Sequence, residues 1–303
     1  MHPLALFVVA TSIWGTTWYA ITFQLATVAP EVGVALRFLL AGTLLLVFAL
    51  VRKIPLTFSR SQHAAIALLG LTNYSVSYIL IYHAERHIVS GLVAVGYAAA
   101  PLVNMLLGRI MVGTPLSKRV AVGGSFGVAG IALIFWPEIA AMQGNPWILV
   151  GAAQTMLAVL ISCYGNIWVG KLYAQGVSGW GPLALSMLWG GAISLVAALA
   201  MGVSFKIEAT PAFFASLAYL AVFGSVFAFG AYFALIGRIG AARAAYVGVM
   251  SPVIALIVSA LYEGFDWRLA TVAGVALAVA GNVLALWNPR PRPAGTTALQ
   301  SRA

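Results

Sequence analysis

The sequence predicts an all-α membrane protein whose ten transmembrane helices form two inverted five-helix repeats. Three observations lead to this fold class. First, the chain of 303 residues is 62% hydrophobic and only 7% charged. Second, many of its apolar stretches reach the roughly 20 residues that a helix needs to cross the hydrocarbon core of a bilayer. Third, prolines and glycines recur about half a chain length apart: Pro101 as Pro252, Gly123 as Gly274, and Gly130 as Gly281.

Ten apolar segments, separated by short polar breaks, are long enough to be spans. Because each half holds an odd number of spans, the second half must enter the membrane from the opposite side. We expect a first repeat at 1–137, a second repeat at 147–288, and a disordered cytoplasmic tail at 289–303, which is rich in Pro and Arg. The predicted spans are 3–26, 31–51, 64–84, 89–112, 120–137, 147–170, 182–202, 213–236, 240–262 and 269–288.

The charged residues predict the orientation of these spans. The side that holds the N-terminus receives most of the Lys and Arg residues, while the opposite side receives all six acidic residues. The positive-inside rule therefore places both termini in the cytoplasm. The net charge of +10 follows from this topology, and the scattered basic residues form no nucleic-acid-binding patch. Those on the N-terminal side are Arg52, Lys53, Arg60, Arg109, Lys118, Arg119, Lys171, Arg238, Arg243, Arg290, Arg292 and Arg302.

The first and sixth spans each carry aromatic residues around a glycine. Trp14 and Trp18 lie one helical turn apart in the first span, and the sixth span carries Tyr164, Asn166 and Trp168. Two such helices would form a cage for flat or apolar side chains. Alternatively, the glycines let neighbouring helices pack closely and the aromatic rings fill the grooves. We favour packing for the glycines, and the cavity for one or two of the aromatic residues.

The third span is the richest in polar residues. Asn73, Tyr74, Tyr78 and Tyr82 fall at helical spacings on one side of the predicted helix, and His83 lies next to its outer end. Polar residues inside spans either line substrate pathways or hold helices together. Tyr74 and Tyr78 fit these two roles equally well. For Tyr82 and His83 we favour the helix interface or the aromatic belt.

A proline interrupts both the fourth and the ninth predicted spans. Pro101 leaves the carbonyl of Tyr97 without its helical donor, and Pro252 does the same for Gly248. A single proline kink is common in membrane helices, but matched interruptions in corresponding spans point to a transporter's binding site. We therefore add the prolines and the polar residues that flank them to the candidate substrate-binding residues. The flanking residues are Tyr97, Asn104, Tyr246 and Ser251.

The spans hold few ionisable groups. No Asp or Glu lies in the middle of a predicted span, and Arg37 is the basic residue that lies well inside one. Arg37 either extends to the outer interface or attracts an anionic group such as a carboxylate, and we favour the first. Near the predicted cavity, His83 is the group that titrates near neutral pH. A carrier driven by the gradient of its substrate, without proton coupling, therefore fits better than a proton-driven one.

Other classes of protein fit the sequence less well. An intramembrane enzyme would need a nucleophile with a base, an aspartate pair or a metal-ligand motif, and none is visible. The single cysteine, Cys163, excludes an internal disulfide and a Cys-based metal site, and we expect no metal or other cofactor. We expect a monomeric carrier of small organic solutes in the lipid bilayer rather than a multi-chain channel. The residues alone leave an amino acid, another metabolite and a drug open as cargo, and enzymatic activity is a remote alternative.

These motifs resemble the drug/metabolite transporter superfamily, and within it the ten-span EamA-type carriers. The resemblance covers nearly the whole chain up to the tail. One departure is Gly113-Thr114-Pro115, where many relatives carry Gly-Glu. The matching motifs are Ile13-Trp14-Gly15, Pro30, Arg37-Phe38, Ala100-Pro101-Leu102, Ser251-Pro252-Val253 and Tyr262-Glu263-Gly264.

Within this superfamily the chain is most similar to the YddG amino-acid exporters. The similarity lies in the aromatic-rich first and third spans and in the pair Tyr82-His83. It implies a basket of ten helices around a central cavity in a bacterial inner membrane. It also implies export of amino acids, including aromatic ones, without ATP or a metal.

Overall fold

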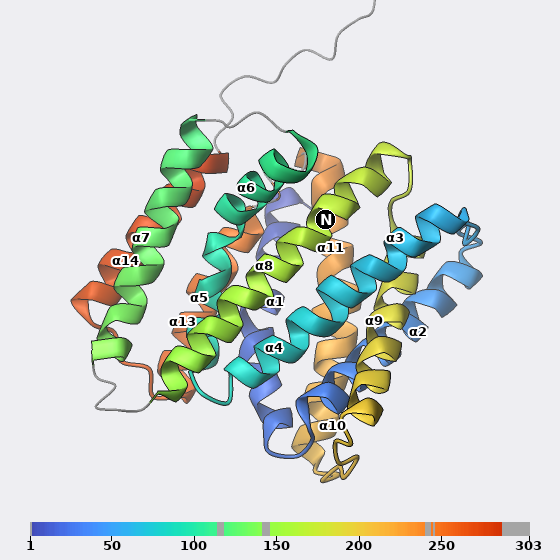
Figure 1. The fold of residues 1–303 in the computed structure, drawn as a ribbon, viewed down its shortest axis with the longest axis horizontal. Coiled ribbons are helices and arrows are strands. Elements are labelled where there is room, and N and C mark those ends of the chain that lie inside the picture. Colours follow the sequence, from blue (N-terminus) through green and yellow to red (C-terminus); the bar gives the residue numbers. More distant parts are fainter. Residues whose placement is uncertain (1, 114–117, 141–145, 240–243, 245, 287–303) are drawn as a thin grey trace, which may run out of the picture.

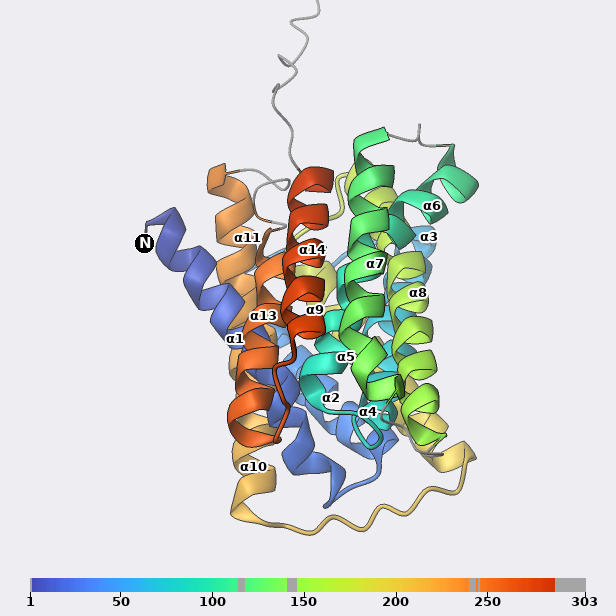
Figure 2. The same cartoon turned by 90° about the vertical axis from the view of Figure 1, so that its left-hand side faces the viewer.

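The computed structural model describes residues 2–113, 118–140, 146–239, 244 and 246–286. In this part of the chain the secondary structure is helical and no strand is present. The helices run up and down side by side, as Figures 1 and 2 show. The predicted all-helical fold is therefore confirmed for the described residues. The tail at 289–303, predicted to be disordered, and Thr114 and Pro115 lie outside them.

In the first half of the chain, five helical rods are described, and two of them are interrupted. The rods α1 (Pro3–Leu25), α2 (Pro30–Val51) and α7 (Lys118–Ala140) are continuous. The third rod consists of α3 (Arg60–Leu71), a π-helical segment (Thr72–Val76) and α4 (Ser77–Ala84). The fourth rod consists of α5 (Ser90–Gly96), a 3-10 turn (Tyr97–Ala99) and α6 (Ala100–Val112).

The described part of the second half repeats this pattern. The rods α8 (Trp147–Ala174), α9 (Trp180–Ala200), α13 (Tyr246–Tyr262) and α14 (Leu269–Leu286) are continuous. Between α9 and α13 lies a rod made of α10 (Pro211–Ala218), a π-helical segment (Tyr219–Phe227) and α11 (Ala228–Ile239). A π-helical segment thus interrupts the third rod of each half. Such segments occur frequently at functional sites.

Local chemistry explains where several of these helices begin. Pro30 and Pro211 occupy the first helical position of α2 and α10, where a missing N–H costs nothing. Before α3, the Ser59 hydroxyl accepts from the Gln62 backbone N–H, and the Gln62 side chain accepts from the Ser59 N–H at 3.0 Å. This capping box satisfies donors that would otherwise be orphaned.

The lengths of the helices match a membrane. Seven of them are long and apolar enough to cross it, and three apolar helices are shorter, at Ala121–Pro137, Tyr246–Tyr262 and Leu269–Ala285. Apolar helices therefore occur at each of the ten predicted positions. The chain is a multi-pass membrane protein, and the exact count of ten spans stays a prediction.

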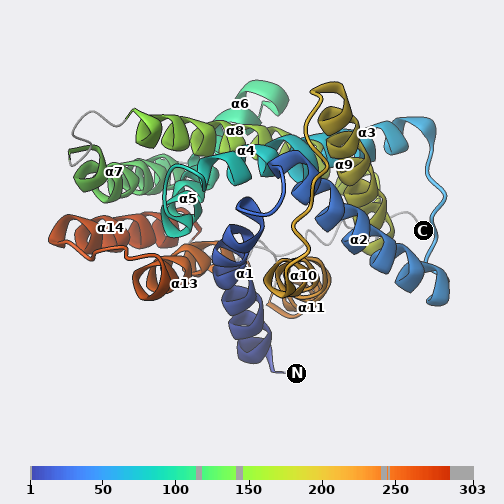
Figure 3. The ribbon, with the colours of Figure 1, turned by 90° about the horizontal axis from the view of Figure 1, so that it is seen from below.

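The two halves pack onto each other through corresponding helices. α2 packs against α9, α5 against α13, and α7 against α14. α1 packs against α11 and α13, while its counterpart α8 packs against α4 and α6. If the two halves are exchanged, the first three contacts map onto themselves, and the contacts of α1 map onto those of α8. An internal two-fold arrangement requires this. In Figure 3, α7 and α14 lie side by side at one edge of the bundle, and α2 and α9 lie together at the other.

Glycines bring α7 and α14 into backbone contact. A Cβ atom added at Gly130 would lie 2.5 Å from the carbonyl oxygen of Gly274, and one added at Gly274 would lie 2.6 Å from that of Gly130. Gly123 and Gly281 meet in the same way. These four glycines are the ones that recur between the halves of the sequence. Gly130 contacts Gly274, the repeat counterpart of Gly123, and Gly123 contacts Gly281, the repeat counterpart of Gly130. Small residues allow this close approach of membrane helices.

The two ends of the bundle differ in charge. At the lower end in Figures 1 and 2, the loops 26–29, 85–89, 201–210 and 263–268 join the rods. We call it the acidic end, because Glu31, Glu85, Glu208, Glu263 and Asp266 lie in or beside these loops. The opposite end, where α1 begins and α14 ends, is called the basic end. It carries Arg52, Lys53, Arg60, Arg109, Lys118 and Lys171.

Two groups of buried hydrogen bonds close the acidic end. In the first, which joins α1, α2 and α4, Glu31 Oε1 lies 2.8 Å from His83 Nε2, and the Tyr82 hydroxyl donates to Gln24 Oε1 at 3.1 Å. Gln24, Glu31 and Tyr82 are all buried. Polar side chains that satisfy one another across helices hold membrane proteins together.

The second group joins α5 to α13 around the carboxylate of Glu263. Glu263 Oε1 accepts from the Ser90 backbone N–H at 3.1 Å, and the hydroxyls of Ser90 and Ser259 both donate to Oε2. Ser259 Oγ in turn accepts from the Gly91 N–H at 2.8 Å. This second group ties the first half to the second at this end, whereas the first group lies within the first half.

At this closed end the buried Nε2 of Gln24 has no hydrogen-bond partner among the described residues, and Glu85 is a second exception. It is buried beside the end of α4, and neither of its carboxylate oxygens has a hydrogen-bond partner in the described part of the chain. Burial raises the pKa of its carboxyl group well above the usual range, the nearby Glu263 carboxylate raises it further, and Arg37 acts in the opposite direction. The acidic end therefore holds a carboxyl group that favours its neutral form.

We expect Gly130→Ala to lower the free energy of unfolding by roughly 1–3 kcal/mol, because the new methyl group overpacks the backbone contact with Gly274. Gly248→Ala is the matched control, since a Cβ atom there would meet nothing within 4 Å. Both changes improve helix propensity equally. Thermal unfolding of the purified variants in detergent tests this. Equal melting temperatures for the two variants would refute the tight α7–α14 contact.

Glu85→Gln should make the folded protein more stable at neutral and higher pH and flatten its stability profile. The folded-state pKa of Glu85 is raised above the value near 4.5 of an unfolded chain. Its contribution is therefore fully present below that value and is lost as the pH rises through the folded-state pKa. Thermal unfolding between pH 5 and 8 measures the effect, with the exposed Glu208→Gln as control. An unchanged profile in Glu85→Gln would show that Glu85 does not titrate in this way.

Candidate functional site

Aromatic side chains from α1, α2, α4 and the interrupted rods meet in the middle of the bundle. The ring of Trp18 lies 5.4 Å from that of Tyr97, measured between centroids. The ring of Phe38 lies 5.2 Å from Tyr74 and 4.7 Å from Tyr78. Four of these rings belong to predicted site residues, namely Trp18, Tyr74, Tyr78 and Tyr97, and Phe38 is the fifth. We call these five residues the aromatic layer.

The aromatic layer is anchored to α8 by a polar contact. The hydroxyls of Tyr97 and Ser162 lie 3.2 Å apart. Tyr97 belongs to the 3-10 turn that immediately precedes α6, where Pro101 replaces a helical donor. The predicted interruption at Pro101 is therefore present, and it places an aromatic residue at the junction of α5, α6 and α8.

Arg37 lies against the same aromatic layer. Its guanidinium carbon is 4.8 Å from the ring centroid of Tyr78 and 5.1 Å from that of Phe38. Only 2% of the residue is exposed, and its Nε and Nη1 atoms have no hydrogen-bond partner among the described residues. The expectation that Arg37 extends to the outer interface is therefore wrong. Its alkyl chain starts two helical turns inside α2, and the guanidinium stays within the protein.

Asparagines from three rods form a polar cluster next to the aromatic layer. Asn73, at the π-helical segment, donates through Nδ2 to Asn166 Oδ1 at 3.2 Å. Asn166 and Asn104 line a cavity of about 380 Å³ between α6 and α8, near the basic end. Lys171 lines the same cavity, and its ammonium group lies 4.0 Å from the ring centroid of Trp168. We call Asn73, Asn104, Asn166 and Trp168 the amide cluster.

The amide cluster contains polar atoms without partners. Asn73 Oδ1, Asn104 Oδ1 and Trp168 Nε1 are buried and form no hydrogen bond with other described residues. A buried polar atom without a partner costs free energy, and inside a membrane bulk water is not at hand to relieve this cost. Two acceptors, on the π-helical segment Thr72–Val76 and on α6, and one donor on α8 thus lack a partner among the described residues.

Trp14 is engaged in a different contact. Its Nε1 donates to the Gly224 carbonyl at 3.1 Å, within the second π-helical segment, and its ring lies 5.1 Å from Phe229 and 5.2 Å from Tyr232. Trp14 and Trp168 are therefore not equivalent: the indole N–H of Trp14 is bonded, whereas that of Trp168 is not. A second, mainly apolar cavity of about 330 Å³ lies near the start of α1, between α1, α2, α9 and α11.

Several predicted site residues lie away from the aromatic layer and the amide cluster. Tyr164 is 37% exposed on α8, and the Tyr246 hydroxyl donates to the Val283 carbonyl on α14 at 3.3 Å. Tyr82 and His83 belong to the closed acidic end. Ser251 is buried where its carbonyl oxygen approaches Gly15.

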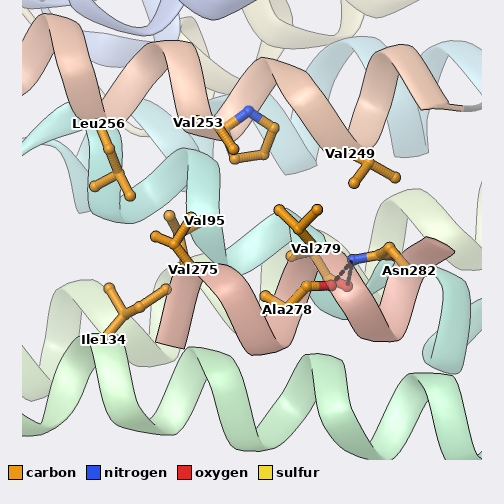
Figure 4. Close-up of a pocket in the computed structure, with 11 residues that line it drawn as sticks. Val95, Ile134, Val249, Val253, Leu256, Val275, Ala278, Val279 and Asn282 are labelled. Carbon is orange, nitrogen blue, oxygen red and sulfur yellow. Dashed lines mark hydrogen bonds between the residues drawn. The ribbon is translucent and has the colours of Figure 1, made fainter. Parts of the chain in front are cut away.

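Pro252 lines a small apolar gap of about 20 Å³ between α13 and α14. Figure 4 shows side chains of α13, such as Val249 and Leu256, facing Val275 and Val279 of α14 across this gap. The surroundings of Pro252 are those of helix packing. The two matched prolines therefore have different environments, with Pro101 next to the aromatic layer and Pro252 at a helix interface.

Sequence reasoning missed three features of the site. The burial of Arg37 was one, although a basic residue without a nearby acidic partner in its own helix was a usable signal. Phe38 and the two π-helical segments were the others, and no proline marks those segments. Among the described residues, no group of three or more His, Cys, Asp or Glu side chains could hold a metal ion.

Comparison with known proteins identifies the family. The profile of the EamA-like transporter family matches residues 2–136 and again residues 149–287. The chain is 31% identical over 248 residues to the Uncharacterized inner membrane transporter YedA of Escherichia coli (strain K12), covering 81% of this chain and 78% of YedA. It is 26% identical over 266 residues to Protein PagO of Salmonella typhimurium, covering 86% of this chain and 84% of PagO.

A solved crystal structure shares the fold. Its chain superposes with a TM-score of 0.67 at 17% sequence identity, and the match covers 93% of this chain and 96% of that chain. The two family matches together span nearly the whole sequence, and each covers the rods of one half. This protein is a membrane transporter that belongs to the EamA-like transporter family.

Proposed function

We propose that this transporter exports amino acids, including aromatic ones, across the inner membrane. The observation that carries the proposal is the amide cluster, whose unpaired atoms lie beside the aromatic layer and a cavity of about 380 Å³. An amino acid with an aromatic side chain needs both kinds of surface. Its ring would stack in the aromatic layer, and its polar groups would bond to unpaired groups such as the amides and the Trp168 indole.

The proposed orientation follows from charge. With ten spans and the basic end in the cytoplasm, both termini are cytoplasmic. Cavities of about 380 Å³ and 330 Å³ lie in the basic half of the bundle. At the acidic end, hydrogen bonds join the helices beside a cavity of about 220 Å³. We take this arrangement as support for a state that loads its substrate from the cytoplasm. Export then requires the acidic end to open and the basic end to close.

The transport cycle we propose is driven by the gradient of the substrate. No acidic side chain belongs to the amide cluster or to the aromatic layer, so neither contains a carboxylate that could relay protons. Glu85 is a carboxyl group with a raised pKa, but it lies at the closed acidic end. Export of another metabolite or a drug by the same site is the alternative, because aromatic surfaces also bind such molecules.

Trp168→Phe should lower the uptake of labelled phenylalanine by roughly tenfold, because it keeps the ring and removes one unpaired hydrogen-bond donor. The matched control is Trp136→Phe, at a tryptophan that is 65% exposed on α7. Uptake is measured in liposomes that contain the purified protein, with labelled tryptophan, phenylalanine and threonine and no imposed pH gradient.

Three outcomes are decisive for this assay. Uptake by the wild type and by Trp136→Phe, but not by Trp168→Phe, supports the proposed site and the proposed substrates. Full uptake by Trp168→Phe would remove the amide cluster from the pathway. No uptake of any amino acid by the wild type, with or without a pH gradient, would overturn the substrate class and favour another metabolite.

A further inference from the structure

Arg37 is a permanent charge inside the bundle. Its pKa in proteins keeps it protonated, so it cannot become neutral to reduce the cost of burial. The guanidinium lies on the faces of Phe38 and Tyr78, and the hydroxyl of Tyr82 lies near it. Aromatic faces and one hydroxyl compensate such a charge only in part. A buried cation in a membrane helix normally has an anionic partner.

The carboxylates near Arg37 do not supply that partner. Glu31 is paired with His83 at 2.8 Å, and Glu263 is bonded to Ser90 and Ser259. Glu85 influences Arg37 electrostatically, yet its own oxygens are unpaired. Within the described residues, Arg37 forms no ion pair, since none of these carboxylates lies within 4.0 Å of it. Both Nε–H and an Nη1 group remain free to donate.

Arg37 lies between the closed acidic end and the aromatic layer. Tyr78 and Phe38 connect it to the layer, and the nearby Tyr82 is bonded to Gln24 at the closed end. It also faces the second half of the chain, because its Nη2 would lie 3.6 Å from a Cβ atom added at Gly224. Gly224 is the π-helical residue whose carbonyl accepts from Trp14. The guanidinium is therefore at the contact of the two halves, next to the two rods that a π-helical segment interrupts.

We propose that Arg37 binds the carboxylate of the transported amino acid at the inner face of the closed acidic end. This inference rests on the proposed function and deepens it, because it assigns the substrate a free carboxylate. A guanidinium matches a carboxylate in shape and charge, and charge-assisted hydrogen bonds are about twice as strong as neutral ones. The ring of a bound aromatic amino acid would then lie in the aromatic layer. Its ammonium group would point towards the unpaired oxygens of Asn73 and Asn104.

Binding of the substrate carboxylate would also change the electrostatic balance at the acidic end, and this change could favour its opening. A bound anion would neutralise Arg37, whose charge is compensated in the structure only by the aromatic faces and a mainly neutral Glu85. Any change in that balance acts on α2 and α4, which carry Glu31, Tyr82 and His83. A substrate that lacks the carboxylate would leave the charge balance as it is. Arg37 would thus distinguish amino acids from amines of the same shape.

The test compares ligands that differ only in the carboxylate. Purified full-length protein in liposomes takes up labelled phenylalanine, and unlabelled phenylalanine, phenylalanine amide and phenethylamine compete with it. For the wild type, we expect the amide and the amine to need at least about tenfold higher concentrations for half-inhibition than phenylalanine does. In Arg37→Gln this ratio should fall to about one, and in Arg37→Lys it should fall only in part. Arg109→Gln, at an exposed arginine near the basic end, is the control and should keep the wild-type ratio.

The outcomes separate this inference from the proposed function. If the wild type takes up phenylalanine but the amide competes equally well, the carboxylate is not recognised and the inference is wrong, while amino acid export stands. If Arg37→Gln keeps the wild-type ratio, another group binds the carboxylate. If Arg37→Gln does not fold, the Arg37→Lys ratio and the wild-type competition decide the question by themselves. If the wild type takes up no amino acid, the proposed function is wrong, and the inference that rests on it is wrong too.

Discussion

Polar groups inside a membrane cannot turn to bulk water, so each needs a partner within the protein or in what the protein binds. The acidic end largely meets this requirement through the pairs of Glu31 with His83 and of Glu263 with Ser90 and Ser259. The exceptions there are Glu85 and the Nε2 atom of Gln24. The middle of the bundle does not meet it, because Asn73, Asn104, Trp168 and Arg37 keep unpaired atoms. We infer from this contrast that the acidic end serves as a closure and the middle serves as the binding site.

The packing of the two halves suggests how such a closure can open. Glycine contacts hold α7 to α14, and Gly42 and Gly191 bring α2 and α9 equally close, with added Cβ atoms 2.9 Å and 2.7 Å from backbone nitrogens. These two pairs lie at opposite edges of the bundle (Figure 3). Between them lie α1, α8 and the interrupted rods. A π-helical segment is a local departure from the regular hydrogen-bond ladder, so we infer that the interrupted rods bend while the glycine-packed edges stay together.

Much of the fold could be predicted because the length and composition of membrane helices are visible in the sequence. α1, α2 and α9 lie within a few residues of their predicted bounds. The contacts of Trp18 with Tyr97 and of Asn73 with Asn166 join residues that polar spacing had singled out. The rotation of a helix about its axis depends on its neighbours, which periodicity cannot reveal. For that reason Tyr164, Tyr246 and Pro252 lie elsewhere, and the burial of Arg37 was not foreseen.

The central claim is that the two halves move against each other around the middle of the bundle. Distances between spin labels at the two ends test it most directly, in a variant whose Cys163 is replaced. One pair of labels at Arg86 and Lys206 spans the acidic end, and another at Arg109 and Arg238 spans the basic end. Saturating phenylalanine should lengthen the first distance and shorten the second in part of the molecules. Unchanged distances at both ends, measured while the labelled protein still transports phenylalanine, would show that the halves do not move in this way.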